Sequence, residues 1–150
     1  MNKLLIFMAC MLMCVLASCI NSNLDDIDSY TESKITNIRF EYRWVTSGNQ
    51  LHVKTLTVQK TINEATNTVE CSITVPGADN TFTEAVRNNV TLANICGYFT
   101  LSTGATVTPL GNAPTMGTIA DFSNKDFDYE VTAADGSKTT WKLKITGFTK

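Results

Sequence analysis

The sequence contains very little histidine and proline, with one histidine and three prolines among its 150 residues. A single imidazole cannot supply a histidine-rich metal site. The formal net charge is −2, which excludes a strongly basic surface for nucleic acid. The single histidine, His52, has no nucleophile or orienting acid marked beside it, as general-base catalysis would require. We therefore expect no enzyme, no metal or other cofactor, and no nucleic-acid partner.

The long apolar run near the N-terminus is too short to cross a membrane. Leu4–Ala17 has 14 residues, whereas ~30 Å of hydrocarbon needs about 20 residues of helix. The run follows Lys3 and has the length of a secretory signal segment. It ends in Leu16-Ala17-Ser18-Cys19, which resembles the bacterial lipobox. An ordinary signal peptide with a chance cysteine is the alternative.

The lipobox reading makes residues 1–18 a lipoprotein signal peptide that is cleaved before Cys19. The Cys19 side chain and the new amino terminus would then be acylated. Several acyl chains hold a protein firmly on a bilayer, since each buried methylene adds about 0.8 kcal/mol. The membrane is therefore an expected partner, through lipid on Cys19, and the expected location is the outer membrane.

Residues 19–34 form an expected tether between this lipid and the domain. The stretch from Ile20 to Lys34 has a net charge of −3 and no sustained apolar period, which is typical of disorder. Its cluster of Asp25, Asp26 and Asp28 resembles the surface-export signal of Bacteroidetes lipoproteins. A solvated spacer is the other interpretation. Export would place the domain on the cell surface.

Residues 35–150 show the alternation of β-strands. The whole chain has 23 threonines, and β-branched residues favour pleated sheets. Val69–Val75 and Trp141–Ile145 alternate apolar and polar side chains, and Asp135-Gly136 is a hairpin turn signal. The pattern predicts an all-β fold, an immunoglobulin-like antiparallel β-sandwich of about seven strands. The one expected helix is Glu84–Asn88.

The alternation also assigns side chains to faces. The first strand turns Ile38, Phe40, Tyr42 and Trp44 inward and Arg39, Glu41 and Arg43 toward solvent. Leu51 and Val53 are expected to face inward as well, while Leu56 and Val58 have the opposite parity. A β-bulge near Lys54-Thr55 would reconcile the two pairs within a single strand. Asp126, Asp128 and Glu130 are expected to pair with Lys142 and Lys144 across a hairpin.

Two cysteines remain in the domain, because Cys10 and Cys14 leave with the signal peptide. Cys71 has the parity of a core residue in its strand, and Cys96 lies among apolar residues. An oxidising compartment permits a disulfide between Cys71 and Cys96. Two separately buried free thiols fit the sequence slightly better, since free cysteine packs as a small apolar side chain.

Segments spread over residues 35–148 resemble a family of Ig-like, cadherin-like β-sandwich domains of unknown function in Bacteroidetes surface lipoproteins. They include an Asp-Phe-Ser-Asn motif and a Tyr-Glu-Val-Thr-Ala-Ala-Asp-Gly-Ser motif in the same order and spacing as in the family. The matching segments are Ile35–Phe40, Ile73–Pro76, Val90–Ile95, Gly104–Pro109, Asp121–Asn124, Tyr129–Ser137 and Trp141–Ile145. Lys125–Asp128 departs from the family by lacking a proline and adding one residue.

The resemblance implies a non-enzymatic surface module for binding or spacing, in glycan capture or adhesion, with polysaccharide or other surface proteins as partners. The alternative is a structural subunit of a surface assembly such as a pilus or adhesin stalk, in which an edge strand pairs with a neighbour. Sugar binding uses exposed aromatic rings. Trp44, at a strand end, and Tyr42 are the candidate ligand-binding residues, although both also fit core positions.

Overall fold

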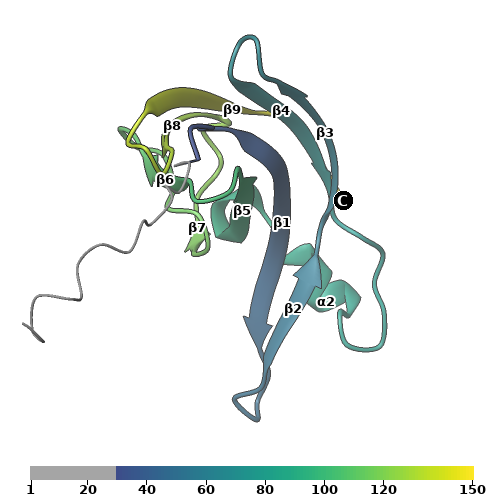
Figure 1. The fold of residues 1–150 in the computed structure, drawn as a ribbon. Helices are drawn as coiled ribbons and strands as arrows, with labels where there is room; N and C mark the ends of the chain where they lie inside the picture. The colour runs from purple at the N-terminus through teal and green to yellow at the C-terminus, as the bar shows by residue number, and fades with distance from the viewer. Residues whose placement is uncertain (1–29) are drawn as a thin grey trace, which may run out of the picture.

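The structure, a computed structural model, describes residues 30–150 and is almost entirely β-sheet. Two sheets face each other across one apolar core (Figure 1). Sheet A has the strand order β2-β1-β5-β7, and sheet B has the order β3-β4-β9-β8-β6. The strands are β1 (Ile35–Val45), β2 (Leu51–Thr55), β3 (Thr57–Asn63), β4 (Thr68–Thr74), β5 (Ile95–Leu101), β6 (Thr106–Pro109), β7 (Ile119–Ala120), β8 (Asp126–Thr132) and β9 (Lys138–Thr149).

The expected all-β sandwich is confirmed, with two differences in its strands. The described residues form nine strands rather than about seven, because the two-residue β7 carries no alternation and the stretch after Gln50 divides in two. The pairing is mixed rather than wholly antiparallel, since β4 and β9 run parallel. The short helix α2 (Glu84–Asn88) is present as expected, and a 3₁₀ turn, η1 (Leu92–Asn94), follows it.

Leu56 explains why the stretch after Gln50 is two strands rather than the expected single strand with a bulge. Leu56 is buried, and its N–H donates to the carbonyl oxygen of Phe40 at 2.9 Å. At this residue the chain leaves sheet A and enters sheet B, so β2 and β3 belong to different sheets. With Leu56 pointing inward, alternation turns Leu51 and Val53 outward. The prediction that these two side chains face the core is therefore wrong.

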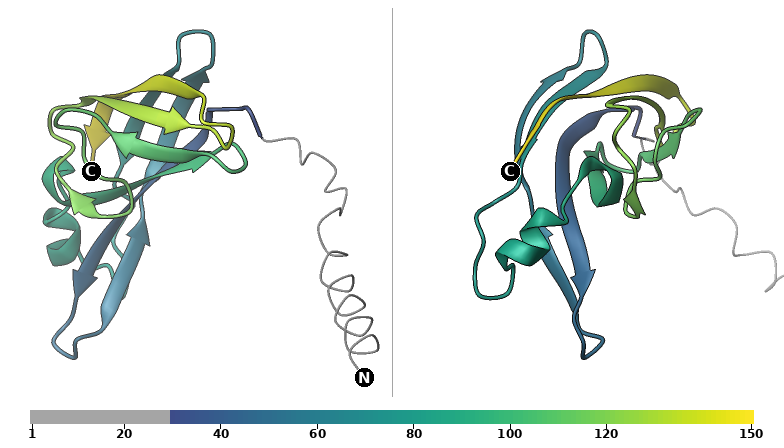
Figure 2. Two further views of the ribbon diagram at one scale, coloured as in Figure 1. Left: turned by 60° about the vertical axis from the view of Figure 1, so that its left-hand side comes forward. Right: turned by 180° about the vertical axis from the view of Figure 1, so that it is seen from behind.

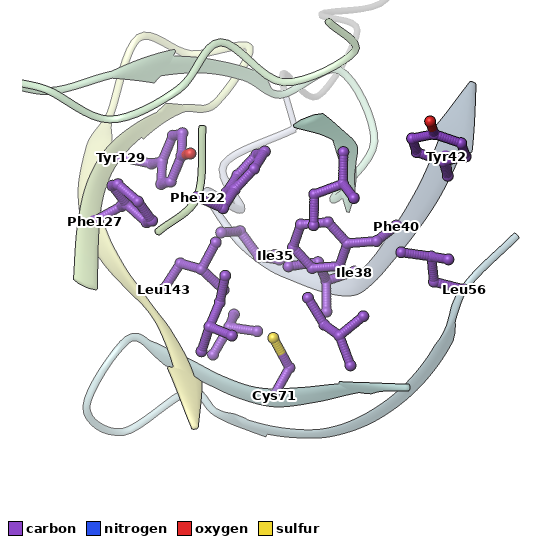
Figure 3. Packing of buried hydrophobic residues seen from close by; sticks show 14 of the residues in the cluster. Ile35, Ile38, Phe40, Tyr42, Leu56, Cys71, Phe122, Phe127, Tyr129 and Leu143 are labelled. Atoms are coloured by element: carbon purple, nitrogen blue, oxygen red, sulfur yellow. The ribbon is translucent and has the colours of Figure 1, made fainter. Parts of the chain in front are cut away.

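The core is built from the strands whose alternation is strongest. Trp141, Leu143 and Ile145 of β9 are at most 3% exposed, as their parity predicts. Phe122, next to the Asx turn in which Ser123 N–H donates to Asp121, is fully buried. Figure 3 shows Phe122, Phe127 and Tyr129 gathered at one end of the core, with Phe40 and Tyr42 following toward the far end of β1.

The last residues of the expected tether already belong to the domain. The carbonyl oxygen of Ser33 accepts a hydrogen bond from the indole Nε1 of Trp141 at 2.9 Å. Lys34 N–H donates to Ser102 Oγ at 3.0 Å, and Ser137 Oγ donates to the Thr31 carbonyl oxygen at 3.2 Å. These bonds hold the entry of the chain against β9, the end of β5 and the turn that follows β8.

Candidate functional site

The far half of β1 and strand β2 form a two-stranded arm that extends beyond the body of the sandwich (Figures 1 and 2). Strand β1 begins at Ile35, beside the first described residues, and ends at Val45 near the tip of the arm. Eleven residues of strand span roughly 33 Å. The tip of the arm therefore lies far from the point where the N-terminal segment joins the domain.

The inner side of the arm carries the two aromatic residues that the sequence selects as ligand candidates. Tyr42 is buried and belongs to the core. Trp44 is half-buried, and its ring lies nearly parallel to those of Tyr42 and His52, with centroids 5.9 and 5.1 Å away. Trp44 thus already stacks on rings of the protein. Its buried indole N–H has no acceptor within residues 30–150, which is the feature that favours a ligand there.

The loop before α2 closes over this aromatic group. Phe82 is fully buried and its ring lies 5.6 Å from that of Trp44. Lys54 Nζ lies 5.4 Å from the centre of the Phe82 ring and 2.6 Å from Asp79 Oδ2. The bond from Lys54, together with the N–H groups of Phe82 and Thr81, holds the pKa of Asp79 well below its ordinary value. The inner side of the arm is a packed surface.

The outer face of sheet A, which points away from sheet B, has a charged network at its centre. Glu41 is expected in solvent, yet it is 5% exposed. Its carboxylate accepts hydrogen bonds from Arg39 at 3.0 Å, Arg43 at 2.7 Å and the Tyr98 hydroxyl at 2.9 Å. Arg43 also bonds the Tyr98 oxygen, and the Arg39 guanidinium lies 3.9 Å from the centre of the Tyr98 ring. Two arginines and a tyrosine cover Glu41 and remove it from water.

The network keeps Glu41 ionised. Burial alone would raise the pKa of this carboxyl, but the hydrogen bonds from Tyr98 and Arg43 and the positive charges of both arginines outweigh it. The pKa of Glu41 therefore lies below its ordinary value. The pKa of Tyr98 is raised to about 12, first by its hydrogen bond with Cys96 and then by burial and by Glu41. At neutral pH the centre of the face carries one surplus positive charge.

Large apolar side chains surround this network and remain exposed. Val45, Leu51, Val53 and Ile119 are 49–59% exposed. Val45 lies opposite Leu51 and Arg43 lies opposite Val53 in the β1–β2 register, while Ile119 lies opposite Cys96. The four therefore share one face of sheet A. The sequence reasoning missed this surface, and the opposite parity of Leu56 was the signal that could have revealed it.

The two domain cysteines are both buried and free. Cys71 points into the core from β4 of sheet B (Figure 3). Cys96 belongs to β5 of sheet A and lies opposite Glu41, on the outer face. The disulfide that the sequence left open is therefore not formed, because the two thiols point in different directions from different sheets. Burial raises the pKa of the Cys71 thiol to about 12.

The outer face of sheet B carries alternating acids and lysines. Lys142 lies 2.7 Å from Asp128, as expected, whereas Lys138 rather than Lys142 or Lys144 reaches Glu130 at 2.8 Å. Lys144 lies 3.9 Å from Glu70 of β4. Beside this last pair is a shallow polar groove of about 280 Å³ across β3, β4 and β9. Its lining residues are Thr61, Asn63, Thr66, Thr68, Glu70 and Lys144.

Within residues 30–150, no three acidic, histidine or cysteine side chains come together as ligands for a metal ion. In the same part of the chain, no helix has the length and apolar character needed to span a membrane. Cys19 and the cluster of Asp25, Asp26 and Asp28 lie outside the described residues. Lipid anchoring and export therefore stay predictions.

The fold and its outer face define a small all-β sandwich domain with a projecting two-stranded arm. A family model described as DUF5018-related matches residues 35–144, so the chain belongs to the DUF5018-related family, a family of unknown function. The crystal structure of a protein from Bacteroides fragilis, inferred to be secreted, is 32% identical with a TM-score of 0.74. The match covers 81% of this chain and 99% of that one. A comparison with curated proteins gives no significant match.

Proposed function

We propose that the protein is a lipid-anchored, non-enzymatic binding module on the bacterial cell surface, and that it acts in adhesion to a protein partner. The observation that carries this proposal is the group of exposed apolar side chains on the outer face of sheet A. Exposed apolar surface gathered on one face marks contact sites. Arginine and tyrosine, here Arg39, Arg43 and Tyr98, are enriched in protein–protein interfaces.

The chemistry of the described side chains supports a role without catalysis. Glu41 is held by three donors, and the lysines of β9 occupy Asp128, Glu130 and Glu70. The Cys71 thiol is protonated at neutral pH because its pKa is about 12. The ionisable groups of these clusters are thus engaged with one another. The resemblance to Ig-like and cadherin-like lipoprotein domains implies the same kind of role.

The proposed location rests on the lipobox and on the relative from Bacteroides fragilis, which is inferred to be secreted. We expect the mature protein to begin at a lipidated Cys19 and to be cut by protease added to intact cells. Cys19→Ala should abolish lipidation and remove the protein from the membrane fraction. Mass spectrometry of the wild-type N-terminus checks this expectation. An intact Met1 or an unmodified Cys19 in the mature wild type would contradict it.

The adhesive role can be measured with beads that carry the mature chain, with Cys19→Ser so that no lipid is added. We expect the beads to bind intact bacteria, and we expect the double variant Leu51→Ser, Val53→Ser to bind at least tenfold less. Glu70→Gln, on the other sheet, is the matched control and should bind as wild type does. Protease treatment of the bacteria should abolish binding, whereas periodate oxidation of their glycans should not.

Glycan capture is the second candidate function, and the polar groove across β3, β4 and β9 is the observation that favours it. Its threonine, asparagine, glutamate and lysine side chains offer donors and acceptors to sugar hydroxyls. In the bead experiment this function gives the reverse outcome. Binding would then be lost after periodate, kept after protease, and weakened by Glu70→Gln rather than by the double variant.

A further inference from the structure

The free edge of the arm is strand β2, which ends the strand order of sheet A. Leu56 N–H donates to the carbonyl oxygen of Phe40, and Thr46 N–H donates to the carbonyl oxygen of Gln50. The even-numbered residues of β2 therefore direct their backbone hydrogen bonds to β1. In an antiparallel pair the intervening residues turn their backbone groups away. The N–H and C=O groups of Leu51, Val53 and Thr55 therefore point out from the edge. Among residues 30–150, the left view of Figure 2 shows no strand or helix on this side of β2.

Two of the other three sheet edges are protected in ways that β2 is not. Proteins blunt their edges with very short strands, proline and charged side chains, above all lysine. Strand β7 has two residues and β6 ends at Pro109. The remaining edge strand, β3, carries Lys60, which donates to Asn37. Strand β2 likewise has one lysine that is engaged, Lys54, which pairs with Asp79. What sets β2 apart from β3 is its apolar side chains. The side chains at its outward-bonding positions include two exposed apolar residues.

We propose that the arm pairs with a second copy of this chain, with β2 running antiparallel to β2 of the other copy and centred on Val53. Leu51 then lies opposite Thr55 of the second copy, and the two valines face each other. All three outward-pointing residues gain backbone partners in this register. The two four-stranded A sheets become one continuous sheet.

The charges of the chain are compatible with self-pairing. In the proposed register Lys54 lies opposite His52 of the second copy, and Asp79 at 2.6 Å already balances Lys54. No two carboxylates and no two lysines lie directly opposite each other in the proposed β2–β2 pair. Residues 35–150 hold ten basic and ten acidic side chains, so two domains do not repel each other through net charge. A second copy is thus an acceptable occupant of this edge.

The size of the contact makes the pairing weak in free solution. A stable complex buries about 800 Å² on each partner, and one five-residue strand with its neighbours offers less than that. This inference deepens the proposed function, on which it rests, because it names the partner. Copies anchored on a surface meet at a high effective concentration, and many weak pairs then act together.

The test measures self-association of the unlipidated mature chain by sedimentation equilibrium from about 0.01 to 1 mM. We expect reversible dimers in wild type. Val53→Pro should weaken association at least tenfold, because proline lacks the outward N–H but is tolerated at an edge position whose N–H faces solvent. Val53→Thr keeps this N–H and the branched shape, and it should associate within threefold of wild type.

Amide hydrogen exchange in wild type tests the same proposal without a substitution. The amides of Leu51, Val53 and Thr55 should gain protection at least tenfold as concentration rises, while outward amides of β3 do not change. A wild type that stays monomeric throughout, or dimers that leave these three amides unprotected, would overturn the proposal. If beads bind bacteria that lack this gene while the chain stays monomeric, the adhesive function stands and the second copy is not its partner.

Discussion

Replacing Trp141 with alanine is expected to remove much of the domain's stability. Trp141 is 1% exposed, and lies opposite Tyr129 in the β8–β9 register. Its indole N–H holds the carbonyl oxygen of Ser33 at 2.9 Å and so ties the entry of the chain to β9. Truncation of a buried tryptophan costs about 3–5 kcal/mol, a large part of the ~5–15 kcal/mol that stabilises a domain.

We expect the melting temperature of Trp141→Ala to fall by roughly 10–20 °C, measured by circular dichroism. The matched control is Lys142→Ala, the next residue of the same strand. Its amine pairs with Asp128 on the outer face of sheet B, where both side chains are partly exposed. Such a pair contributes at most about 1 kcal/mol. Equal melting temperatures for Trp141→Ala and wild type would contradict the core position of this ring.

The strands with clean alternation could be predicted from the sequence. In β4 and in residues 141–145 of β9 the apolar residues alternate with polar ones, so a single assignment buries Val69, Cys71 and Ile73 on one strand and Trp141 and Leu143 on the other. The hairpin turn was also readable, because Gly136 adopts a φ of 88° that favours glycine. Local rules suffice where one face of a strand is fully buried.

The β2–β3 stretch shows where such rules fail. Periodicity records a change of face, but it does not say whether the cause is a bulge or a passage from one sheet to the other. Only the partner strands distinguish the two: β2 pairs with β1, which precedes it, and β3 pairs with β4, which follows it in the other sheet. The exposed face with Leu51 and Val53 was lost through this ambiguity.

Glu41 was missed for a related reason. A glutamate between two arginines on the polar side of a strand indicates a solvated surface. Its burial depends on Tyr98, which is 57 residues away and reaches Glu41 because β5 pairs with β1. The candidate site therefore required the three-dimensional pairing, whereas a β-rich domain of a family of unknown function could be recognised from the order and spacing of sequence segments.

Gly97→Ala is expected to destabilise the domain by about 1–3 kcal/mol, because the added methyl has no room. Gly97 lies in β5, facing the core opposite Phe40. A Cβ there would lie 2.9 Å from Phe40 Cε1, 3.0 Å from Phe122 Cζ and 3.1 Å from Met116 Sδ. Phe40 and Phe122 are fully buried and pack edge to face at 5.2 Å, so neither ring can move without displacing the other.

Gly77→Ala is the matched control for Gly97→Ala. A Cβ at Gly77 meets no atom of residues 30–150 within 4 Å. The same chemical change should leave the free energy of unfolding unchanged or raise it by up to about 1 kcal/mol, since alanine restricts the conformations of the unfolded chain. Urea unfolding of both variants measures the difference. Were Gly97→Ala as stable as Gly77→Ala, the two rings would not close over β5 as described, and the core between Phe40 and Phe122 would have space for a methyl group.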